Sequence, residues 1–233
     1  MATREARIQV PCTLTTPQVQ SVLDRLYRNA KQIDQEALAK ANPVTEGMHG
    51  DDKFAVRSEL LKEAYLPIPR DVGQLLYMLA RTYPCRTIVE FGTSFAISTI
   101  HLASAVRDNG GGKVIATELH ADKARRATEN LREAGLLDLV ELRVGDARET
   151  LRAIDGEVDF AFIDGWKELY LPVLQLIEPR LRPGALVVAD NLNMAGEILR
   201  GYVDYVSAEE NGYIAVQLPI GDRLSVALRL GRR

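Results

Sequence analysis

The sequence predicts an α/β fold in which helices cover both faces of a mostly parallel seven-stranded sheet that an antiparallel hairpin closes at its C-terminal end. Between residues 88 and 189, five short apolar runs rich in β-branched residues alternate with segments of helical periodicity. Helical segments of this length connect parallel strands as crossovers. The last two apolar runs, 213–218 and 223–230, are separated only by a Pro-Ile-Gly-Asp sequence. So short a turn joins antiparallel strands.

The first quarter of the chain precedes the sheet and is expected to be helical. Pro17 suits the first turn of a helix with Thr16 as its N-cap, and apolar residues follow at helical spacing until Pro43, which is expected to end the helix. Residues 42–53 are then expected to form a loop that could lie over a site. A second, shorter helix is expected at 54–64.

The central part of the chain supplies the sheet and its crossovers. Pro67 and Pro69 enforce an extended segment before a helix at 70–82. We then expect strands at 88–91, 113–118, 139–144, 158–163 and 184–189, with helices at 95–107, 121–134, 148–154, 167–179 and 195–210 between and after them.

Composition limits the class of protein. The 233 residues are 46% hydrophobic and 26% charged, with a net charge of −3, which suits one globular core and gives no electrostatic surface for nucleic acid. No apolar run approaches membrane-spanning length, and the first residues lack the apolar core of a signal peptide. Cys12 and Cys85 fall outside any metal or redox pattern. We therefore expect a cytoplasmic protein with reduced thiols and with neither nucleic acid nor a membrane as partner.

The turn after the first strand indicates a nucleoside cofactor. Ligands of doubly wound sheets bind at the carboxyl ends of the strands, so Gly92 would let the backbone approach a ligand while Glu118, at the end of the second strand, reaches a ribose diol. A dinucleotide fingerprint requires three glycines, but Ser94 and Ala96 stand where the other two belong. This favours a cofactor without a diphosphate, such as S-adenosylmethionine. The alternative is that Gly92 is an ordinary turn glycine of an α/β protein.

Two later strands end in acidic residues. Asp164 follows the fourth strand, and Asp190-Asn191 follow the fifth. Neighbouring strands lie about 4.8 Å apart, so these side chains are expected to emerge together. Two carboxylates and an amide oxygen form an incomplete set of hard ligands suited to Mg²⁺. The alternative is that each acid faces solvent.

Lys167 is a candidate general base. It lies three residues after Asp164, in the first helical turn, where a cation opposes the helix dipole. A lysine that is partly buried beside a divalent cation loses its proton more readily, as a base requires. Trp166 could flank an adenine or wall a substrate pocket. Asp146, after the third strand, could accept a hydrogen bond from adenine or cap the following helix.

These residues resemble the cation-dependent O-methyltransferases of the catechol and caffeoyl-coenzyme A type. The most specific pieces are Val89-Glu90-Phe91-Gly92, the run from Asp164 through Trp166, Lys167 and Tyr170 to Pro172, and Asp190-Asn191. The resemblance implies a Rossmann-like methyltransferase fold over residues 66–233. Residues 1–65 would form an N-terminal arm and helices that pack on the domain or on a partner subunit. A long N-terminal helix is more typical of the branch of the family that tends to form homodimers.

The resemblance also assigns roles. It implies that Asp164, Asp190 and Asn191 hold Mg²⁺ and that Lys167 deprotonates the hydroxyl that is methylated. Glu118 would bind the ribose, Ser98 the methionine carboxylate, Asp146 and Ala147 the adenine region, and Ile68 the cofactor near its methyl group. The full set of expected S-adenosylmethionine-binding residues is Ile68, Glu90, Gly92, Thr93, Ser94, Ser98, Glu118, Leu119, Asp146, Ala147, Asp164 and Trp166.

The sequence departs from the family pattern at two positions. Ala96 replaces a glycine common in the turn, which bears on the position of the methionine end of the cofactor. Ser225 stands where catechol enzymes carry a glutamate that grips the second phenolic hydroxyl, which argues against a simple catechol as the natural substrate. We expect methylation of one hydroxyl of a small molecule, most simply a vicinal dihydroxy aromatic. Three alternatives stay open: a metal-independent methyltransferase for another acceptor, a nicotinamide-dependent oxidoreductase, and a binder without catalytic activity.

Overall fold

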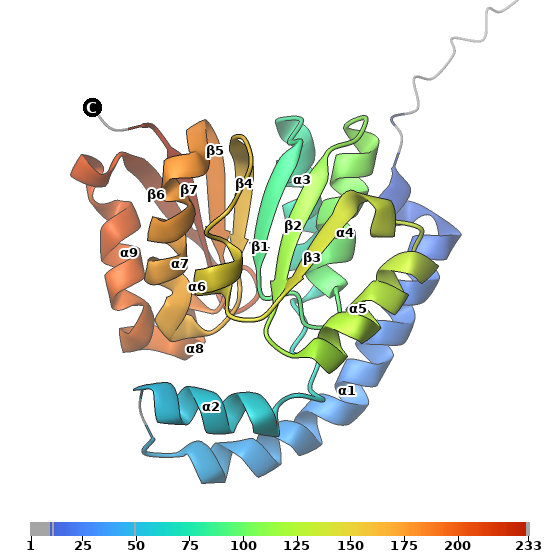
Figure 1. Cartoon of the computed structure of the whole chain (residues 1–233), viewed down its shortest axis with the longest axis vertical. Coiled ribbons are helices and arrows are strands. Elements are labelled where there is room, and N and C mark those ends of the chain that lie inside the picture. Colours follow the sequence, from blue (N-terminus) through green and yellow to red (C-terminus); the bar gives the residue numbers. More distant parts are fainter. Residues whose placement is uncertain (1–9, 11, 49, 232–233) are drawn as a thin grey trace, which may run out of the picture.

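The sheet of this protein has seven strands in the order β3-β2-β1-β4-β5-β7-β6 (Figure 1). The structure, a computed structural model, describes residues 10, 12–48 and 50–231. Strands β1 to β5 are parallel, and β7 pairs antiparallel with both β5 and β6, which confirms the predicted fold. The strands are β1 Thr87–Phe91, β2 Lys113–Glu118, β3 Val140–Val144, β4 Val158–Ile163, β5 Leu181–Ala189, β6 Tyr213–Leu218 and β7 Leu224–Arg229.

Helices cover both faces of the sheet, and each face has its own apolar core. Alternate residues of one strand face opposite sides, so Ile88 of β1 joins one core while Val89 joins the other. Helices α1 (Pro17–Thr45), α3 (Arg70–Thr82), α4 (Ile97–Asp108) and α5 (Ala121–Glu133) contribute to the first core. The second core is completed by α6 (Ala147–Thr150), α7 (Tyr170–Ile177), α8 (Leu192–Ala195) and α9 (Arg200–Ser207).

The predicted loop at 42–53 is wrong for most of its length. Helix α1 continues through Pro43 to Thr45, and α2 (Gly50–Leu60) already begins five residues later. A proline removes a single backbone hydrogen bond, and so close to the end of a 29-residue helix the loss is small. The Thr45 hydroxyl also donates to the Ala41 carbonyl, 2.9 Å away. The second half of α1 and α2 therefore form a helical hairpin below the carboxyl ends of the strands (Figure 1).

Several other predicted helices differ in their bounds: the helix expected at 54–64 is Gly50–Leu60, the one at 148–154 is Ala147–Thr150, and the one at 167–179 begins as a 3₁₀ turn at Lys167–Leu169 before Tyr170–Ile177. The helix expected at 195–210 is broken into α8, a 3₁₀ turn at Gly196–Leu199, α9 and a second 3₁₀ turn. Gly196 has φ +41° and ψ −114°, which no α-helix accommodates. Of the expected N-terminal arm, residues 1–9 and 11 lie outside the described residues. Thr13–Thr15 form a 3₁₀ turn that buries Leu14. No helix of the described residues has both the length and the apolar character needed to span a membrane.

His101 is a buried neutral residue at the contact between α3 and α4. Its Nδ1 lies 2.8 Å from the Ile97 carbonyl oxygen, and its other edge faces Gly73, where an added Cβ would lie 2.5 Å from Nε2. Burial lowers the pKa of His101 to about 4. Gly73 thus allows the two helices to approach, and His101 has no exposed edge through which to act as a functional base.

This burial makes folding stability depend on pH. The unfolded chain binds a proton at His101 near pH 6.5 and the folded chain only near pH 4. The contribution of His101 is therefore complete above pH 6.5 and is lost as the pH falls toward 4. Between pH 8 and pH 5, this group should reduce the free energy of unfolding by about 2 kcal/mol. Urea unfolding of the protein and of His101→Gln, which does not titrate, measures the difference, and equal pH slopes would contradict it.

Candidate active site

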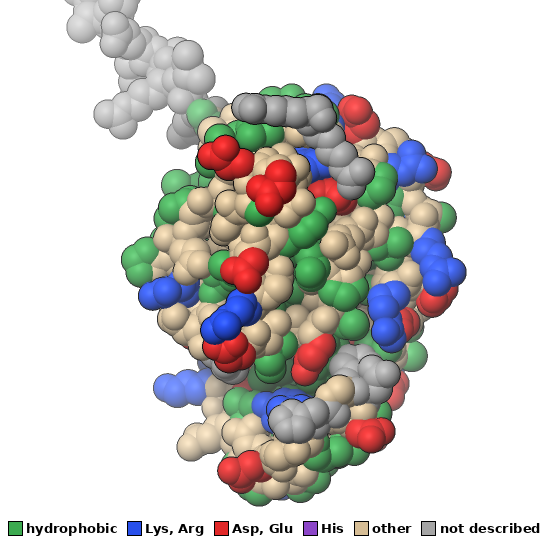
Figure 2. All heavy atoms as spheres, turned by 90° about the vertical axis from the view of Figure 1, so that its left-hand side faces the viewer, with side chains coloured by type: hydrophobic (Ala, Val, Ile, Leu, Met, Phe, Trp, Pro, Cys, Tyr) green, Lys and Arg blue, Asp and Glu red, His purple; other side chains and the backbone are tan. Residues whose placement is uncertain are grey.

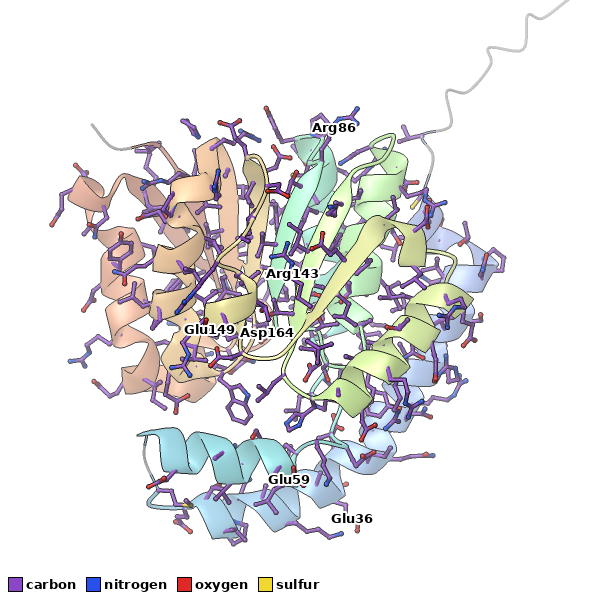
Figure 3. The ribbon with its side chains drawn as sticks, viewed as in Figure 1. Glu36, Glu59, Arg86, Arg143, Glu149 and Asp164 are labelled. Atoms are coloured by element: carbon purple, nitrogen blue, oxygen red, sulfur yellow. The ribbon has the colours of Figure 1, made fainter. Side chains whose placement is uncertain are left out.

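A cleft of about 480 Å³ lies at the carboxyl edge of the sheet, where the helical hairpin faces the ends of β1, β2 and β4. In Figure 3, Arg86 lies at the amino edge of the sheet and Asp164 at the opposite, carboxyl edge above α2. The expected cofactor residues that line the cleft are Ile68, Gly92, Thr93, Ser94, Ser98, Glu118, Asp164 and Trp166.

The turn between β1 and α4 forms one wall of the cleft and contains several left-handed residues. Gly92 has φ +103°, and a Cβ there would lie 2.6 Å from the Asp164 carbonyl oxygen. Ser94 and Ala96 also have positive φ, +50° and +73°, which costs about 1 kcal/mol or more for residues with a Cβ. The close approach of Gly92 to Asp164 brings the end of β4 into the cofactor cleft.

Glu118 presents an oriented carboxylate to the cleft. One oxygen accepts a hydrogen bond from the Ser94 amide at 2.8 Å, and the other accepts one from the His120 amide at 2.9 Å. The side chain is buried, with 8% of its surface exposed. Each carboxylate oxygen can accept further hydrogen bonds, so the group is placed to bind a vicinal diol.

Asp164 and Asp190 follow neighbouring strands in register, since Ile163 of β4 pairs with Ala189 of β5. Burial raises the pKa of Asp164, and burial together with the charge of Asp164 raises the pKa of Asp190 to about 7. The two carboxylates thus repel each other in a region with little water. Such an arrangement favours a cation between them.

Asn191 brings an amide oxygen to the same point. Its backbone is left-handed, with φ +65°, a conformation that asparagine tolerates better than most residues. Its amide oxygen accepts a hydrogen bond from the Lys167 ammonium at 2.6 Å. Asp190 supports this geometry because its carboxylate accepts a hydrogen bond from the backbone amide of Asn191 at 2.7 Å.

The Lys167 ammonium is held by three oxygen atoms. Besides Asn191 it donates to the Asp164 carboxylate at 3.2 Å and to the Tyr170 hydroxyl at 2.8 Å. The Tyr170 hydroxyl in turn donates to the Asp190 carbonyl at 3.1 Å. The predicted metal ligands and the predicted base therefore form one cluster at the ends of two neighbouring strands: Asp164, Asp190, Asn191 and Lys167.

The donor set fits a divalent cation. Two carboxylates, of which Asp164 raises the pKa of Asp190, are hard ligands with an amide oxygen beside them, and the Lys167 ammonium offsets part of their negative charge. No group of three or more His, Cys, Asp or Glu side chains able to hold a metal occurs within residues 10, 12–48 and 50–231. A metal would thus depend on Asn191 or on substrate oxygens to complete its coordination.

Some expected cofactor residues do not line this cleft: Glu90, Leu119, Asp146 and Ala147. Glu90 is fully buried beneath the turn, where the hydroxyls of Thr93 and Thr99 donate to it, and burial raises its pKa to about 7. Asp146 caps α6 by accepting a hydrogen bond from the Arg148 amide at 2.8 Å. Asp146 therefore caps the following helix, which is one of the two roles that the sequence predicted for it. The cofactor roles of all four residues stay predictions.

The cleft also contains residues that the sequence did not indicate. Asp34 of α1 accepts hydrogen bonds from the Tyr65 and Leu66 amides at 2.7 and 2.8 Å, which ties the helical hairpin to the extended segment before α3. Lys123 of α5 is buried beside Glu118, and burial lowers its pKa. No local motif marks these residues, because their partners lie about 30 residues away or on another element.

A second cavity of about 510 Å³ adjoins the first and shares Arg57, Trp166 and Lys167 with it. Its other described walls come from the end of α1, from α2 and from the 3₁₀ turn after α8. Ser225 is buried in β7 and lines neither cavity. Lys167 therefore lies between a cofactor-sized cleft and a separate opening through which a second molecule can reach it.

Comparisons with known proteins agree with this geometry. Residues 89–192 match the family model described as "Methyltransferase domain". Catechol O-methyltransferases of Niastella koreensis and Mycobacterium tuberculosis are 33% and 35% identical to this chain over 156 residues, 64% of this chain and 70% of each relative. Caffeoyl-CoA O-methyltransferase 3 of Nicotiana tabacum is 27% identical over 183 residues, 69% of this chain and 75% of the relative.

Solved structures show the same similarity. The O-methyltransferase TomG from Streptomyces achromogenes, in complex with SAM, superposes with a TM-score of 0.65 at 27% identity over 84% of this chain and 90% of TomG. Cofactor-bound Rv0187 from MTB superposes with a TM-score of 0.66 at 26% identity, over 96% of this chain and 100% of that one.

Proposed function

This chain belongs to the O-methyltransferase family that includes the catechol and caffeoyl-coenzyme A enzymes, and from that premise we propose its reaction. It transfers the methyl group of S-adenosylmethionine to one hydroxyl of a small vicinal dihydroxy aromatic, with a divalent cation, most simply Mg²⁺. The observation that carries the proposal is the cluster of Asp164, Asp190, Asn191 and Lys167 between the two cavities.

The cofactor occupies the 480 Å³ cleft in this proposal. Glu118 accepts hydrogen bonds from the two ribose hydroxyls, and its own two backbone donors keep it oriented. Ser98, in the first turn of α4, donates to the methionine carboxylate, where the helix N-terminus favours negative charge. Ile68 borders the methyl end. The methyl group then points toward Lys167 and the second cavity.

Asp164, Asp190 and Asn191 would hold the cation, which supplies Lewis acidity that lowers the pKa of a substrate hydroxyl. Lys167 acts in its neutral amine form, after its ammonium has given up one proton to solvent; Nζ then accepts the substrate proton, and Tyr170 and Asn191 orient the amine. The substrate oxygen then forms a bond to the methyl carbon as the carbon–sulfur bond breaks, leaving S-adenosylhomocysteine and a methyl ether. Trp166, which lines both cavities, limits the space between the reactants. Correct placement of the two reactants lowers the activation barrier by several kcal/mol, and by about 7 kcal/mol or more when the alignment is ideal.

Replacing Glu118 with glutamine is expected to weaken S-adenosylhomocysteine binding about 10- to 100-fold. The amide keeps the shape of the carboxylate, but its NH₂ group meets the Ser94 or His120 amide donor and leaves a buried donor unpaired. Isothermal titration calorimetry measures the affinity. Glu129→Gln, an exposed α5 position that pairs with Arg125, is the matched control. Equal affinities for the two variants would contradict the assignment.

Metal removal tests the proposal as a whole. The protein is incubated with labelled S-adenosylmethionine and a panel of vicinal dihydroxy aromatics, with EDTA or with added Mg²⁺. We expect methylation that EDTA abolishes and Mg²⁺ restores. Turnover that is insensitive to EDTA would instead support a metal-independent methyltransferase. Cofactor binding without turnover on any acceptor would support a binder without catalytic activity.

Thermal denaturation separates the cofactor classes. Ligand that binds only the folded state raises the melting temperature. S-adenosylhomocysteine should raise it and NADH should not, since only Gly92 of the dinucleotide fingerprint is present. The reverse result would favour an oxidoreductase.

A further inference from the structure

In the proposed reaction the acceptor approaches through the second cavity, and one helix gives that cavity a basic wall. Lys53 and Arg57 of α2 both line it. They are four residues apart, which places them on one face of the helix. Figure 2 shows that the surface is hollowed between the lower lobe, formed by the α1–α2 hairpin, and the rest of the molecule above, with basic side chains near the hollow.

Arg57 is held in place by neutral groups. Its guanidinium donates to the Thr45 hydroxyl at 2.9 Å and to the Asn42 amide oxygen at 3.0 Å. Thr45 is buried and itself hydrogen-bonded to the Ala41 carbonyl. The arginine is therefore positioned across the hairpin without its charge being neutralised by these contacts.

Neither cation has an acidic partner within the part of the chain whose side chains are described. No carboxylate there lies within 4.0 Å of the Lys53 or Arg57 nitrogens, although many other basic residues of the protein form such pairs. A guanidinium has five N–H donors, and Arg57 uses two of them in its hydrogen bonds to Thr45 and Asn42. Arg57 thus retains both charge and donors for a ligand.

Two acidic residues, Glu46 and Glu168, also line the cavity. Both are exposed, whereas Lys53 and Arg57 are half-buried. Solvent screens exposed charges more strongly than partly buried ones. Solvent therefore screens the two cations less than the two acids that line the same cavity, and Arg57 is common to both cavities.

We propose that the methyl acceptor carries an anionic group, a carboxylate in the simplest case, that binds Arg57 with support from Lys53. This inference rests on the proposed function and defines its substrate class as an acidic vicinal dihydroxy aromatic. The ring oxygens face Lys167 and the cation ligands, and the carboxylate points back toward α2. Arg57 is then a specificity-determining residue, since a guanidinium pairs with a carboxylate through two parallel hydrogen bonds.

The test compares an acid with its neutral ester. 3,4-Dihydroxyphenylacetate and its methyl ester carry the same dihydroxyphenyl ring. The methylene group insulates this ring from the carboxyl group, so the reactivity of the hydroxyls is nearly the same in both. The wild-type protein should show a kcat/KM about 10-fold or more higher for the acid, on the scale of one charged hydrogen bond. Arg57→Gln should lower this acid-to-ester ratio about 10-fold, through a higher KM for the acid. Lys53→Gln should have a smaller effect in the same direction.

Lys40→Gln is the matched control. It removes one positive charge from the same hairpin, at an exposed position that pairs with Glu36 and lines neither cavity, so the acid-to-ester ratio should stay at the wild-type value. A merely structural role of Arg57 would reduce kcat/KM for both acceptors equally, which overturns the proposal. An unchanged ratio in Arg57→Gln overturns it as well.

Binding measurements distinguish a failure of this inference from a failure of the proposed reaction. Calorimetry with S-adenosylhomocysteine and Mg²⁺ present measures the affinity for the acid and for the ester without turnover. If neither acceptor is methylated but the acid binds more tightly in an Arg57-dependent manner, the anion site stands and the proposed reaction fails. If both are methylated and the acid binds no more tightly than the ester, the reaction stands and the anion site is wrong.

Discussion

Turnover of the Asp190→Asn variant is expected to fall at least about 100-fold at low Mg²⁺, because losing residues that merely hydrogen-bond a metal ligand already costs 10- to 100-fold. The change keeps the volume of the side chain and removes one of two buried negative charges. Raising the Mg²⁺ concentration should restore part of the activity. Asp190 does not line the cofactor cleft, so the affinity for S-adenosylhomocysteine should stay nearly constant.

The measurement is kcat/KM as a function of Mg²⁺ concentration, with cofactor affinity from calorimetry. Asp155→Asn is the control, because this exposed aspartate precedes β4 and lies at the opposite edge of the sheet. Loss of activity that no Mg²⁺ concentration improves, accompanied by a lower melting temperature, would mean that Asp190 is structural. Full activity of Asp190→Asn in EDTA would remove the metal from the mechanism.

Replacing Lys167 is expected to reduce kcat about 10²- to 10⁴-fold, the usual contribution of a positioned general base. Lys167→Gln removes both charge and base, whereas Lys167→Arg keeps the charge but cannot give up its proton at neutral pH. Both variants should lose kcat to a similar extent if Lys167 acts by accepting the proton. Single-turnover kinetics with saturating cofactor measure the chemical step directly.

The arginine variant decides between two roles for the lysine. Near wild-type turnover of Lys167→Arg would show that a positive charge beside Asp164 and Asn191 is sufficient, and proton removal would need another group. Lys113→Gln, at the start of β2 on the far edge of the sheet and paired with Glu141, should keep full activity. A similar loss in that control would indicate a general effect on the fold.

The elements of the sheet could be predicted because their signals are local. β1, β2 and β4 are short, nearly continuous buried apolar runs, and Gly92, Glu118 and Asp164 stand at or directly after their ends. The parallel order then brings Asp164 and Asp190 together without further information, since β4 and β5 are neighbours. The chemical cluster therefore follows from chain topology.

The helical hairpin could not be predicted in the same way. Pro43 indicates a helix end by local rules, yet α1 continues because Thr45 and Arg57 connect its last turn to α2. Similarly, the sequence shows Gly73 and His101 but not that one faces the other. Thr45 and Arg57 are 12 positions apart, and Gly73 and His101 are 28 positions apart, so no short sequence pattern contains either pair.

The sequence by itself determined the α/β class, the antiparallel end of the sheet and the candidate residues at the strand ends, because periodicity and turn chemistry are properties of neighbouring residues. Tertiary structure alone decided where the α1–α2 hairpin lies, that Lys167 opens onto two cavities, and that Arg57 faces both. Packing between distant segments sets the shape and charge of the second cavity, and such packing depends on the whole fold.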